Sequence, residues 1–262
     1  MLTDLDYLIS KKLFEIKKIF IGVFMQKLFV EEVCGDEIVL SEEQSRHIAK
    51  SLRMKKGDML TVCNSKGSDF GCIIEEITPS VVLKVCYEQA SDSEPTVKVH
   101  LYQCLPKGDK FDGVVKKCTE LGAYCFTPVL SKRCVSRPDK KSLLKKIQRY
   151  NKISLEASQQ SGRGIVPVVN ECRDFKDAVL NCSEDVKIIF YEGGGERLCK
   201  LVEKDTKSVA VFIGSEGGFE KDEVDFAVEH GFVNATLGKR ILRTETAPVC
   251  AVSVIMSLTD NI

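Results

Sequence analysis

The residues best suited to chemistry lie in two short segments near the C-terminus. The first reads IGSEGGF over residues 213–219, and its glycines allow the backbone to take positive φ and to approach a ligand closely. The second reads GKRILRTET over residues 238–246 and combines guanidinium, carboxylate and hydroxyl groups with two apolar side chains. A carboxylate can accept a proton, and a guanidinium can stabilise a developing negative charge. We therefore expect a ligand-binding and catalytic site here, although a glycine-rich turn is more often only a connection.

Two predicted strands position these segments. Residues 209–213 read VAVFI, which predicts a strand buried on both faces, and residues 232–237 predict a second strand. Between them, an amphipathic stretch with acidic residues in its first turn predicts a helix that ends at Gly231. A threonine and a proline then begin an apolar helix over residues 249–258. Loops that leave the carboxyl ends of neighbouring strands are where open α/β sheets bind ligands, so both segments fall at such an edge.

The rest of the chain divides into two regions of different texture. The first consists of short β-branched segments with the spacing of a small β-barrel or sandwich, interrupted by one helix that begins at a capping box of Ser41 and Gln44. A polar, proline-terminated stretch over residues 89–95 has the composition of a linker, so the first domain covers residues 25–90. Beyond it, strands alternate with longer helical patterns, which predicts an α/β domain with a largely parallel sheet over residues 96–262.

Charge and cysteine usage narrow the class of protein. The chain has 38 Lys and Arg against 38 Asp and Glu, so no global field attracts nucleic acid, and RNA affinity must come from local basic patches. Twelve cysteines are scattered singly and there are only three histidines, which argues against a zinc site and a disulfide framework and predicts a cytosolic protein without a metal. Within residues 1–24, the apolar run over 19–24 is too short to span a bilayer, and this N-terminal extension is assigned no role.

The two segments resemble the signature motifs of the RsmE family, which are SPOUT-class methyltransferases that act on uridine N3 in 16S ribosomal RNA. The resemblance covers nearly all of the chain from Met25 to its end. It implies a PUA-like β-barrel that binds RNA over residues 25–90, and a SPOUT methyltransferase domain over residues 96–262 whose parallel sheet ends in a C-terminal trefoil knot. It also implies S-adenosylmethionine-dependent methylation of N3 of a specific uridine, in the small ribosomal subunit, by a cytoplasmic homodimer with the apolar helix 249–258 in its interface.

By this resemblance, S-adenosylmethionine binds in a cleft between the knotted loops, which grip it mainly through backbone groups. Close approach of the backbone to the cofactor accounts for the glycines. The positions that match the family's cofactor-binding segments are Phe190, Tyr191, Glu192, Gly214, Ser215, Glu216, Gly217, Leu237, Gly238, Arg240, Ile241 and Leu242.

The chemistry of the implied reaction suggests catalytic roles. The N3 proton of uracil is only weakly acidic, so a cation that stabilises the anion on the base lowers the barrier, and Arg243 is the candidate. Glu216 is expected to receive the proton or to orient the group that does. In the alternative interpretation, Arg243 pairs with Glu245 or Glu216 only to hold the loop. The sequence shows no dedicated general base, and both interpretations stay open.

Basic residues outside the two segments are candidate RNA contacts. Phosphate contacts would position the RNA, and a flipped uridine would carry the specificity. The stripe of lysines from Lys141 to Lys152 is predicted to be only a solvated helix face. The motif LPKGDK over residues 105–110 contains the candidate Lys107 and also Lys110. The candidates on the barrel-domain helix and in loops are Arg46, His47, Arg53, Lys107, Lys132, Arg133 and Arg163.

Two other classes of protein compete with the methyltransferase. A Rossmann oxidoreductase would use the glycine triplet over residues 193–195, but the triplet lacks the G-x-G-x-x-G spacing of a dinucleotide site. A non-enzymatic RNA-binding protein would use only the barrel and the basic loops. The concentration of motifs near the C-terminus, far from the barrel, argues against this second alternative.

Overall fold

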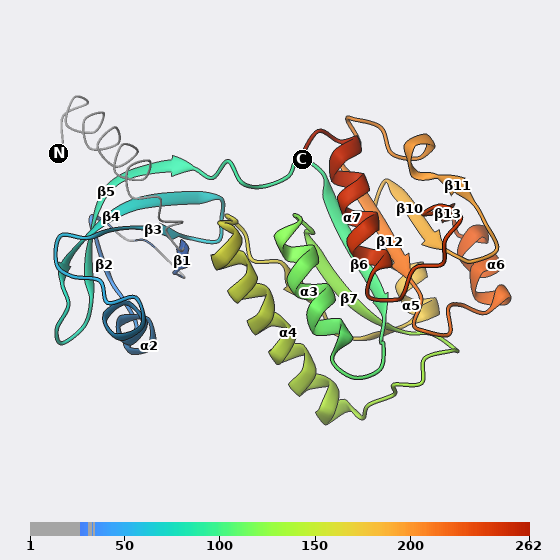
Figure 1. Cartoon of the computed structure of the whole chain (residues 1–262), viewed down its shortest axis with the longest axis horizontal. Helices are drawn as coiled ribbons and strands as arrows, with labels where there is room; N and C mark the ends of the chain where they lie inside the picture. The colour runs from blue at the N-terminus through green and yellow to red at the C-terminus, as the bar shows by residue number, and fades with distance from the viewer. Residues whose placement is uncertain (1–26, 31–32, 34) are drawn as a thin grey trace. The chain divides into compact units, whose positions relative to one another are not determined.

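The structure is a computed structural model that describes residues 27–30, 33 and 35–262, so the expected extension over residues 1–24 lies outside the described residues. The chain forms two compact units (Figure 1). One unit contains the described residues up to Glu94 together with residues 158–166, and the other contains residues 95–157 and 167–262. The segment 158–166, which the sequence pattern assigns to the second domain, therefore lies with the first unit.

The first unit is built on a five-stranded sheet with the strand order β1-β3-β4-β5-β2. β1 and β3 are parallel, and the other neighbouring strands are antiparallel. Side chains that alternate along these strands face a common core, in which Val62, Ile74 and Leu83 are fully buried. The strands are β1 (Lys27–Phe29), β2 (Glu37–Val39), β3 (Met59–Cys63), β4 (Ser68–Glu76) and β5 (Val82–Ala90).

A short helix, α2 (Glu42–Arg46), interrupts these strands at the predicted capping box. Ser41 Oγ accepts a hydrogen bond from the Gln44 N–H at 3.3 Å, and the Gln44 side chain accepts one from the Ser41 N–H at 3.2 Å. The chain continues as a π-helical turn, η1 (His47–Ser51), which buries Ile48 in the core of the first unit. The charged residues of this helix and turn are left on the surface.

The second unit is an α/β layer structure around an eight-stranded sheet in which all pairs of strands are parallel, as the sequence predicts. Its order is β11-β13-β10-β12-β6-β7-β8, with β9 paired to β7. The strands are β6 (Lys98–Cys104), β7 (Cys125–Leu130), β8 (Val168–Val169), β9 (Arg173–Asp174), β10 (Val186–Phe190), β11 (Glu196–Arg197), β12 (Ser208–Ile213) and β13 (Val233–Thr236). The helices are α3 (Lys110–Glu120), α4 (Lys140–Ser161), α5 (Phe175–Leu180), the 3-10 turn η2 (Leu198–Lys200), α6 (Lys221–Glu229) and α7 (Ala247–Leu258). The last residues of α4, 158–161, belong to the first unit.

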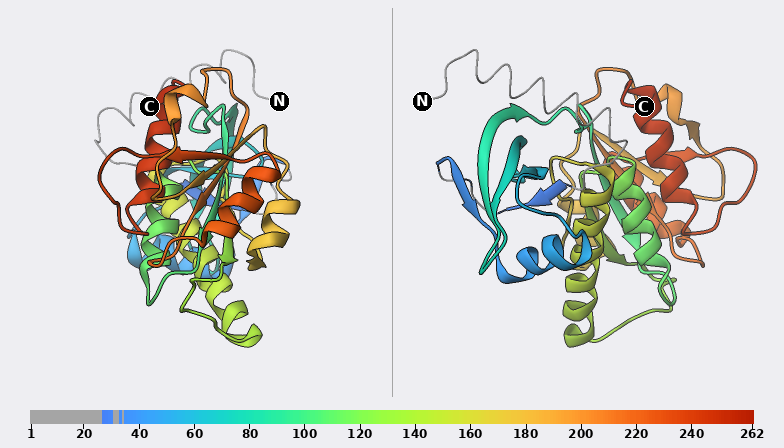
Figure 2. Two further views of the ribbon diagram at one scale, coloured as in Figure 1. Left: turned by 90° about the vertical axis from the view of Figure 1, so that its right-hand side faces the viewer. Right: turned by 60° about the vertical axis from the view of Figure 1, so that its left-hand side comes forward.

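Helices cover both faces of this sheet, with α3, α4 and α7 on one face and α5 and α6 on the other (Figure 2). The apolar run of β12 is buried on both sides, because Val209 and Val211 face the core under α3 and α7, while Ala210 and Phe212 face the core under α5 and α6. Among the described residues, no helix combines the length and the apolar character needed to cross a bilayer.

The strand order brings the two signature segments together. β10 lies between β12 and β13, so the turn after β12 and the loop after β13 leave the same edge of the sheet as the end of β10. The second segment then runs directly into α7, whose first turn contains Pro248 and whose N-cap position is Thr246. The edge at the carboxyl ends of these three strands is the place where the sequence predicts a ligand site.

Candidate active site

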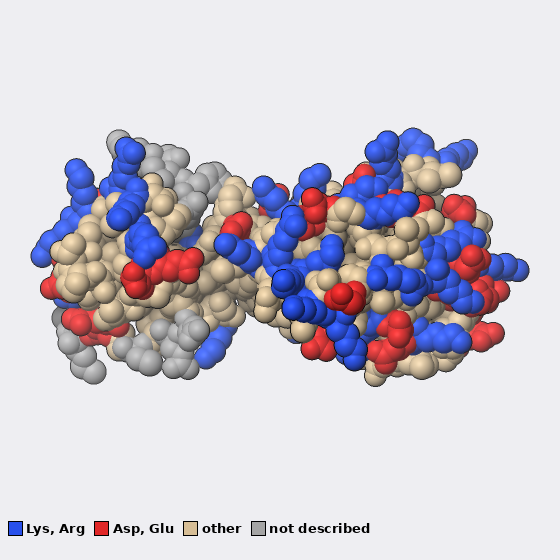
Figure 3. Space-filling view, turned by 90° about the horizontal axis from the view of Figure 1, so that it is seen from below, with Lys and Arg blue, Asp and Glu red and all other residues tan. Residues whose placement is uncertain are grey.

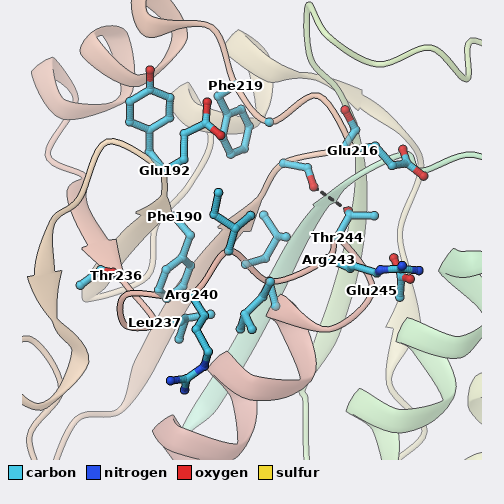
Figure 4. A pocket seen from close by; sticks show the side chains of 18 of the residues that line it. Phe190, Glu192, Glu216, Phe219, Thr236, Leu237, Arg240, Arg243, Thr244 and Glu245 are labelled. Carbon is cyan, nitrogen blue, oxygen red and sulfur yellow. Dashed lines mark hydrogen bonds between the residues drawn. The ribbon is translucent and has the colours of Figure 1, made fainter.

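A cavity of about 480 Å³ opens at this edge of the sheet (Figure 4). It is lined by residues from the ends of three strands and the segments that follow them: 190–192 at β10, 213–216 and 218–219 at β12, and 235–245 at β13. Lys110 and Ala247 complete the lining. Every position that the sequence assigns to the cofactor therefore lines this cavity, except Gly217.

Two positions in the turn after β12 require glycine for different reasons, Gly214 because of close contacts and Gly218 because of its positive φ. A Cβ atom on Gly214 would lie only 2.8 Å from Gly218 Cα, so no side chain fits there. Gly218 has φ +67° and its N–H donates to the Ser215 carbonyl at 2.9 Å, which closes the turn. Only Gly218 among the three glycines of this turn has a positive φ; the other two are required by close approach.

Gly217 faces the neighbouring loop after β7 instead of the cavity. Its carbonyl accepts a hydrogen bond from Arg133 Nη1 at 2.9 Å, and a Cβ on Gly217 would lie 3.0 Å from Arg133 Cβ. Arg133 also donates through Nε to Glu220 Oε1 at 2.8 Å, at the start of α6. This part of the turn is therefore anchored by an arginine that the sequence assigns to RNA.

Thr244 connects the two signature segments, a role that the sequence analysis missed. Its buried hydroxyl donates to the Gly214 carbonyl at 2.7 Å and accepts from Gln103 Nε2 at 3.1 Å (Figure 4). Gln103 Nε2 lies 3.3 Å from the same Gly214 carbonyl and 3.0 Å from the Cys104 carbonyl. Polar side chains inside an otherwise apolar sheet are a signal that could have identified this connection, because buried polar groups are almost always hydrogen-bonded.

A carboxylate, a lysine and a second carboxylate lie at one side of the cavity. Glu216 Oε1 accepts hydrogen bonds from Lys110 Nζ at 2.7 Å and from the Lys107 N–H at 3.1 Å. The Lys110 Nζ also lies 3.7 Å from Glu245 Oε2. Burial raises the pKa of the Glu216 carboxyl, but the hydrogen bonds from Lys110 and from backbone N–H groups outweigh burial and hold that pKa below its usual value.

Arg243 lines the cavity without taking part in this cluster. Its side chain is exposed, and in the described part of the chain no carboxylate forms an ion pair with it. Figure 4 shows Glu216, Arg243 and Glu245 at one side of the cavity, with Phe190 and Glu192 opposite. Both carboxylates that the sequence offered as partners of Arg243 are instead paired with Lys110, so the guanidinium remains available for a ligand.

The basic residues predicted to contact RNA fall into different environments. Arg46, His47 and Arg53 are exposed on α2, on η1 and just after it. Lys107 is exposed in the loop before α3. In the view of Figure 3, lysine and arginine side chains cover much of one face of the second unit, with acidic side chains scattered among them.

Lys132 holds the loop after β7 against α6, as Arg133 does. Its backbone N–H donates to Glu223 Oε1 at 2.8 Å, and its ammonium group pairs with Asp222. The side chain remains more than half exposed, at 55%. Lys132 therefore combines a contact to the acidic first turn of α6 with a surface position that RNA can reach.

Arg163 is buried, with 3% of its surface exposed. Its guanidinium donates to both oxygens of Glu94, at 3.2 Å and 2.6 Å, and Glu94 Oε1 also accepts from the N–H groups of Gly164 and Ile165. Burial raises the pKa of Glu94, but these hydrogen bonds outweigh burial and lower it below its usual value. The structure thus gives Arg163 a role in holding residues 158–166 within the first unit, which argues against the RNA contact that its glycine-containing loop suggested.

The glycine triplet over residues 193–195 has a structural explanation. Gly194 has φ +89°, and a Cβ on Gly195 would lie 2.4 Å from the Asn234 carbonyl oxygen. The triplet lets the chain turn back after β10 so that β11 pairs with β13. These glycines do not line the cavity, and nothing in this turn resembles a dinucleotide-binding loop.

Among the described residues, no group of three or more His, Cys, Asp or Glu side chains is placed to hold a metal ion. All of the cysteines in the described part of the chain are free thiols. The cavity is lined by backbone amides, carboxylates, hydroxyl groups, the two lysines Lys110 and Lys239, and guanidinium groups.

The fold and the cavity define an RNA methyltransferase with a PUA domain. Residues 92–256 match the family model described as an RNA methyltransferase domain, and residues 40–86 match the one described as an RNA methyltransferase PUA domain. The chain belongs to the RsmE family, the ribosomal RNA small subunit methyltransferases E. The resemblance in the two signature segments is thereby confirmed, as are the PUA-like domain and the parallel α/β sheet.

Individual relatives are similar over most of their length. The ribosomal RNA small subunit methyltransferase E of Bacillus subtilis is 33% identical over 231 residues, which cover 84% of this chain and 90% of that relative. A methyltransferase from Legionella pneumophila, solved in complex with its cofactor SAM, has a TM-score of 0.82 at 30% identity and covers 90% of this chain and 98% of its own. The enzyme from Neisseria gonorrhoeae bound to S-adenosyl methionine has a TM-score of 0.82 at 28% identity, covering 89% and 98%.

Proposed function

We propose that this chain transfers a methyl group from S-adenosylmethionine to N3 of a specific uridine in 16S ribosomal RNA, in the small ribosomal subunit. The observation that carries the proposal is the cavity at the carboxyl ends of β10, β12 and β13, which both signature segments of the RsmE family line. Relatives from Legionella pneumophila and Neisseria gonorrhoeae were solved with this cofactor bound.

The residues around the cavity fit such a cofactor. The N–H groups of residues 239–242 donate no hydrogen bond within the described part of the chain, so they are available to a ligand. Gly214 and Gly218 line the cavity and place no side chain between their own backbone atoms and a ligand. Phe190 and Leu242 add apolar surface. When bound, S-adenosylmethionine supplies an electrophilic methyl group on its sulfonium.

Arg243 is the proposed electrostatic catalyst. Loss of the N3 proton places negative charge on the uracil ring, and a guanidinium beside that ring stabilises the charge as it develops. The side chain of Arg243 lines the cavity, is exposed and is free of carboxylate partners among the described residues. It therefore pays no cost of breaking an ion pair when the substrate binds.

Two groups of basic residues are the proposed RNA contacts. Arg46, His47 and Arg53 would bind phosphates from the first unit, and Lys107, Lys132 and Arg133 from the second. A flipped uridine would then enter the cavity between the two signature segments, where sequence-specific contacts are made.

The oligomeric state, the knot and the cellular location are further proposals that rest on the RsmE resemblance. We propose a homodimer. In the single subunit, Ile241 at the cavity is 86% exposed, and Val249 and Val254 on α7 are only partly buried. Apolar side chains that remain exposed in one subunit are expected where a second subunit covers them. We also propose the SPOUT trefoil knot for the segments around β12, β13 and α7, and a cytoplasmic location where ribosomal RNA is modified.

The test is methyl transfer from labelled S-adenosylmethionine to small ribosomal subunits that lack the modification, followed by nucleoside analysis of the RNA. We expect label in N3-methyluridine with the wild-type chain. Label in another nucleoside would contradict the proposed reaction. Light scattering of the purified chain tests the dimer, and a monomer at micromolar concentration would contradict it.

A further inference from the structure

Glu216, Lys110 and Glu245 lie at one side of the cavity, and the two carboxylates differ in the hydrogen bonds that they accept. Glu216 accepts hydrogen bonds from Lys110 Nζ and from the Lys107 N–H, and its second oxygen lies 3.4 Å from that N–H. Its carboxylate therefore already holds strong donors, which disfavours uptake of a further proton. This arrangement makes Glu216 a brace for the turn after β12 and a poor proton acceptor.

Glu245 lies in the opposite situation. Its Oε2 is shielded from solvent and accepts no hydrogen bond from any described residue. Among the residues that the structure describes, Lys110 is the cation paired with it, and the Lys110 Nζ lies 3.7 Å from Oε2, beyond hydrogen-bond distance. Buried carboxylate oxygens are normally hydrogen-bonded, so one that lacks a donor beside a ligand cavity is a site where a donor from a ligand is expected.

The backbone around Glu245 is held in place. Thr244 is buried and hydrogen-bonded to Gly214, and the Arg243 carbonyl accepts from the N–H groups of Thr246 and Ala247 at 2.8 Å and 2.9 Å. The Glu245 side chain is 30% exposed and lines the same cavity as Arg243. A proton acceptor and an anion-stabilising cation thus reach one cavity from one rigid segment.

We infer that Glu245 is the catalytic residue that accepts the N3 proton of the uridine, and that Lys110 is a positioning residue that bridges the Glu216 and Glu245 carboxylates. This inference rests on the proposed function. In the step, the uridine N3–H bond breaks, the proton goes to Glu245 Oε2, and the N3 electron pair forms the new bond to the methyl carbon. The electron pair of the broken carbon–sulfur bond stays on sulfur, and Glu245 later releases its proton to water.

Charged groups from three segments surround Glu245. Lys110 lies on α3, Glu216 follows β12, and Arg243 precedes Glu245 on the same loop. Lys110 pairs with both carboxylates, so Lys110→Met removes the cation that positions Glu245 and should slow methyl transfer.

The experiment compares Glu245→Gln with the matched variant Glu216→Gln in single-turnover methyl transfer at saturating cofactor. We expect Glu245→Gln to slow the step by about 10²- to 10⁴-fold, the range for loss of a general base. Glu216→Gln should slow the step far less than Glu245→Gln does. Calorimetric titration with S-adenosylmethionine and thermal unfolding serve as readouts besides activity, and Glu245→Gln should match wild type within about threefold in cofactor affinity.

A substrate with a more acidic N3 proton distinguishes a loss of proton transfer from a loss of rate caused by a structural change in the variant. RNA that contains 5-fluorouridine needs the base less, so Glu245→Gln should recover most of its lost rate on this RNA. An equal loss on both RNAs, or a Glu245→Gln rate within threefold of wild type, overturns the assignment of Glu245. If Glu245→Gln does not fold, Lys110→Met decides: it should be slow on RNA with uridine and recover on RNA with 5-fluorouridine, and a rate within threefold of wild type on uridine overturns the inference. A wild-type chain that binds the cofactor but forms no N3-methyluridine overturns the proposed function itself, a result distinct from these.

Discussion

The hydroxyl of Thr244 offers the sharpest test of how the cavity is held together. Thr244→Val keeps the shape of the side chain but removes the donor to the Gly214 carbonyl at 2.7 Å and the acceptor for Gln103 Nε2 at 3.1 Å. Gln103 Nε2 retains the Cys104 carbonyl at 3.0 Å and the Gly214 carbonyl at 3.3 Å, so no partner is left unsatisfied. Two net hydrogen bonds of about 1 kcal/mol each are lost, which gives a cost of about 2 kcal/mol.

This cost falls on the arrangement of the two signature segments that the cofactor requires. If it acts on that arrangement, the dissociation constant of S-adenosylmethionine rises by about 10- to 30-fold, because 1.4 kcal/mol corresponds to a factor of about ten. The assay is calorimetric titration of the purified variant, with thermal unfolding in parallel.

Thr246→Val is the matched control. Thr246 is exposed and makes no side-chain hydrogen bond at the N-cap of α7, so we expect its dissociation constant to stay within twofold of wild type. A Thr244→Val variant that binds the cofactor as tightly as Thr246→Val would refute the role given to Thr244.

Three further predictions concern the glycine turn, the buried charges and pH. Gly214→Ala places a Cβ 2.8 Å from Gly218 Cα and should abolish cofactor binding measured by calorimetry. Gly113→Ala in α3, where no atom lies within 4 Å of the new Cβ, should instead raise the melting temperature slightly. Equal changes in cofactor binding and melting temperature for the two variants would contradict the steric argument. Arg163→Ala removes the cation that pairs with Glu94 and should lower the free energy of unfolding by about 3 kcal/mol in denaturant titrations, without changing the salt dependence of RNA binding. A reduced salt slope would restore Arg163 as an RNA contact. Burial raises the pKa of Glu184, but hydrogen bonds from His100 and Cys182 outweigh burial and lower that pKa from 4.5 to about 2. Glu184→Gln should therefore have a lower free energy of unfolding than wild type at neutral pH, and the difference should shrink as pH falls from 4.5 towards 2. A difference that does not change with pH would rule out the stabilisation by the charged carboxylate.

The secondary structure was largely predictable because it depends on local patterns. The apolar run over residues 209–213 lies in β12. The acidic residues at the start of 221–229 form the first turn of α6, and the predicted proline lies in the first turn of α7. Two signature segments at the carboxyl ends of strands also indicated the cavity, since loops at that edge converge in parallel sheets. These features follow from periodicity, capping and turn chemistry within a few residues.

The pairing of side chains in the cavity could not be predicted in the same way. Lys110 lies more than a hundred residues before Glu216 in sequence, and only the parallel register of the sheet brings α3 beside the turn after β12. Arg163 illustrates the same limit, because its loop contains serine and glycine as exposed loops do, yet its partner Glu94 lies 69 residues away. Charges in surface-like loops were therefore assigned to RNA when some of them hold the fold together.

The measurement that tests the central claim most directly is the single-turnover rate of N3-methyluridine formation by Arg243→Ala on small ribosomal subunits at saturating S-adenosylmethionine. Arg197→Ala is the control, because Arg197 is an exposed arginine of the second unit that does not line the cavity. Loss of one group that stabilises the developing anion should slow Arg243→Ala by about 10²- to 10³-fold while Arg197→Ala keeps the wild-type rate. Equal rates for the two variants would contradict the assignment of this cavity and of Arg243 to methyl transfer.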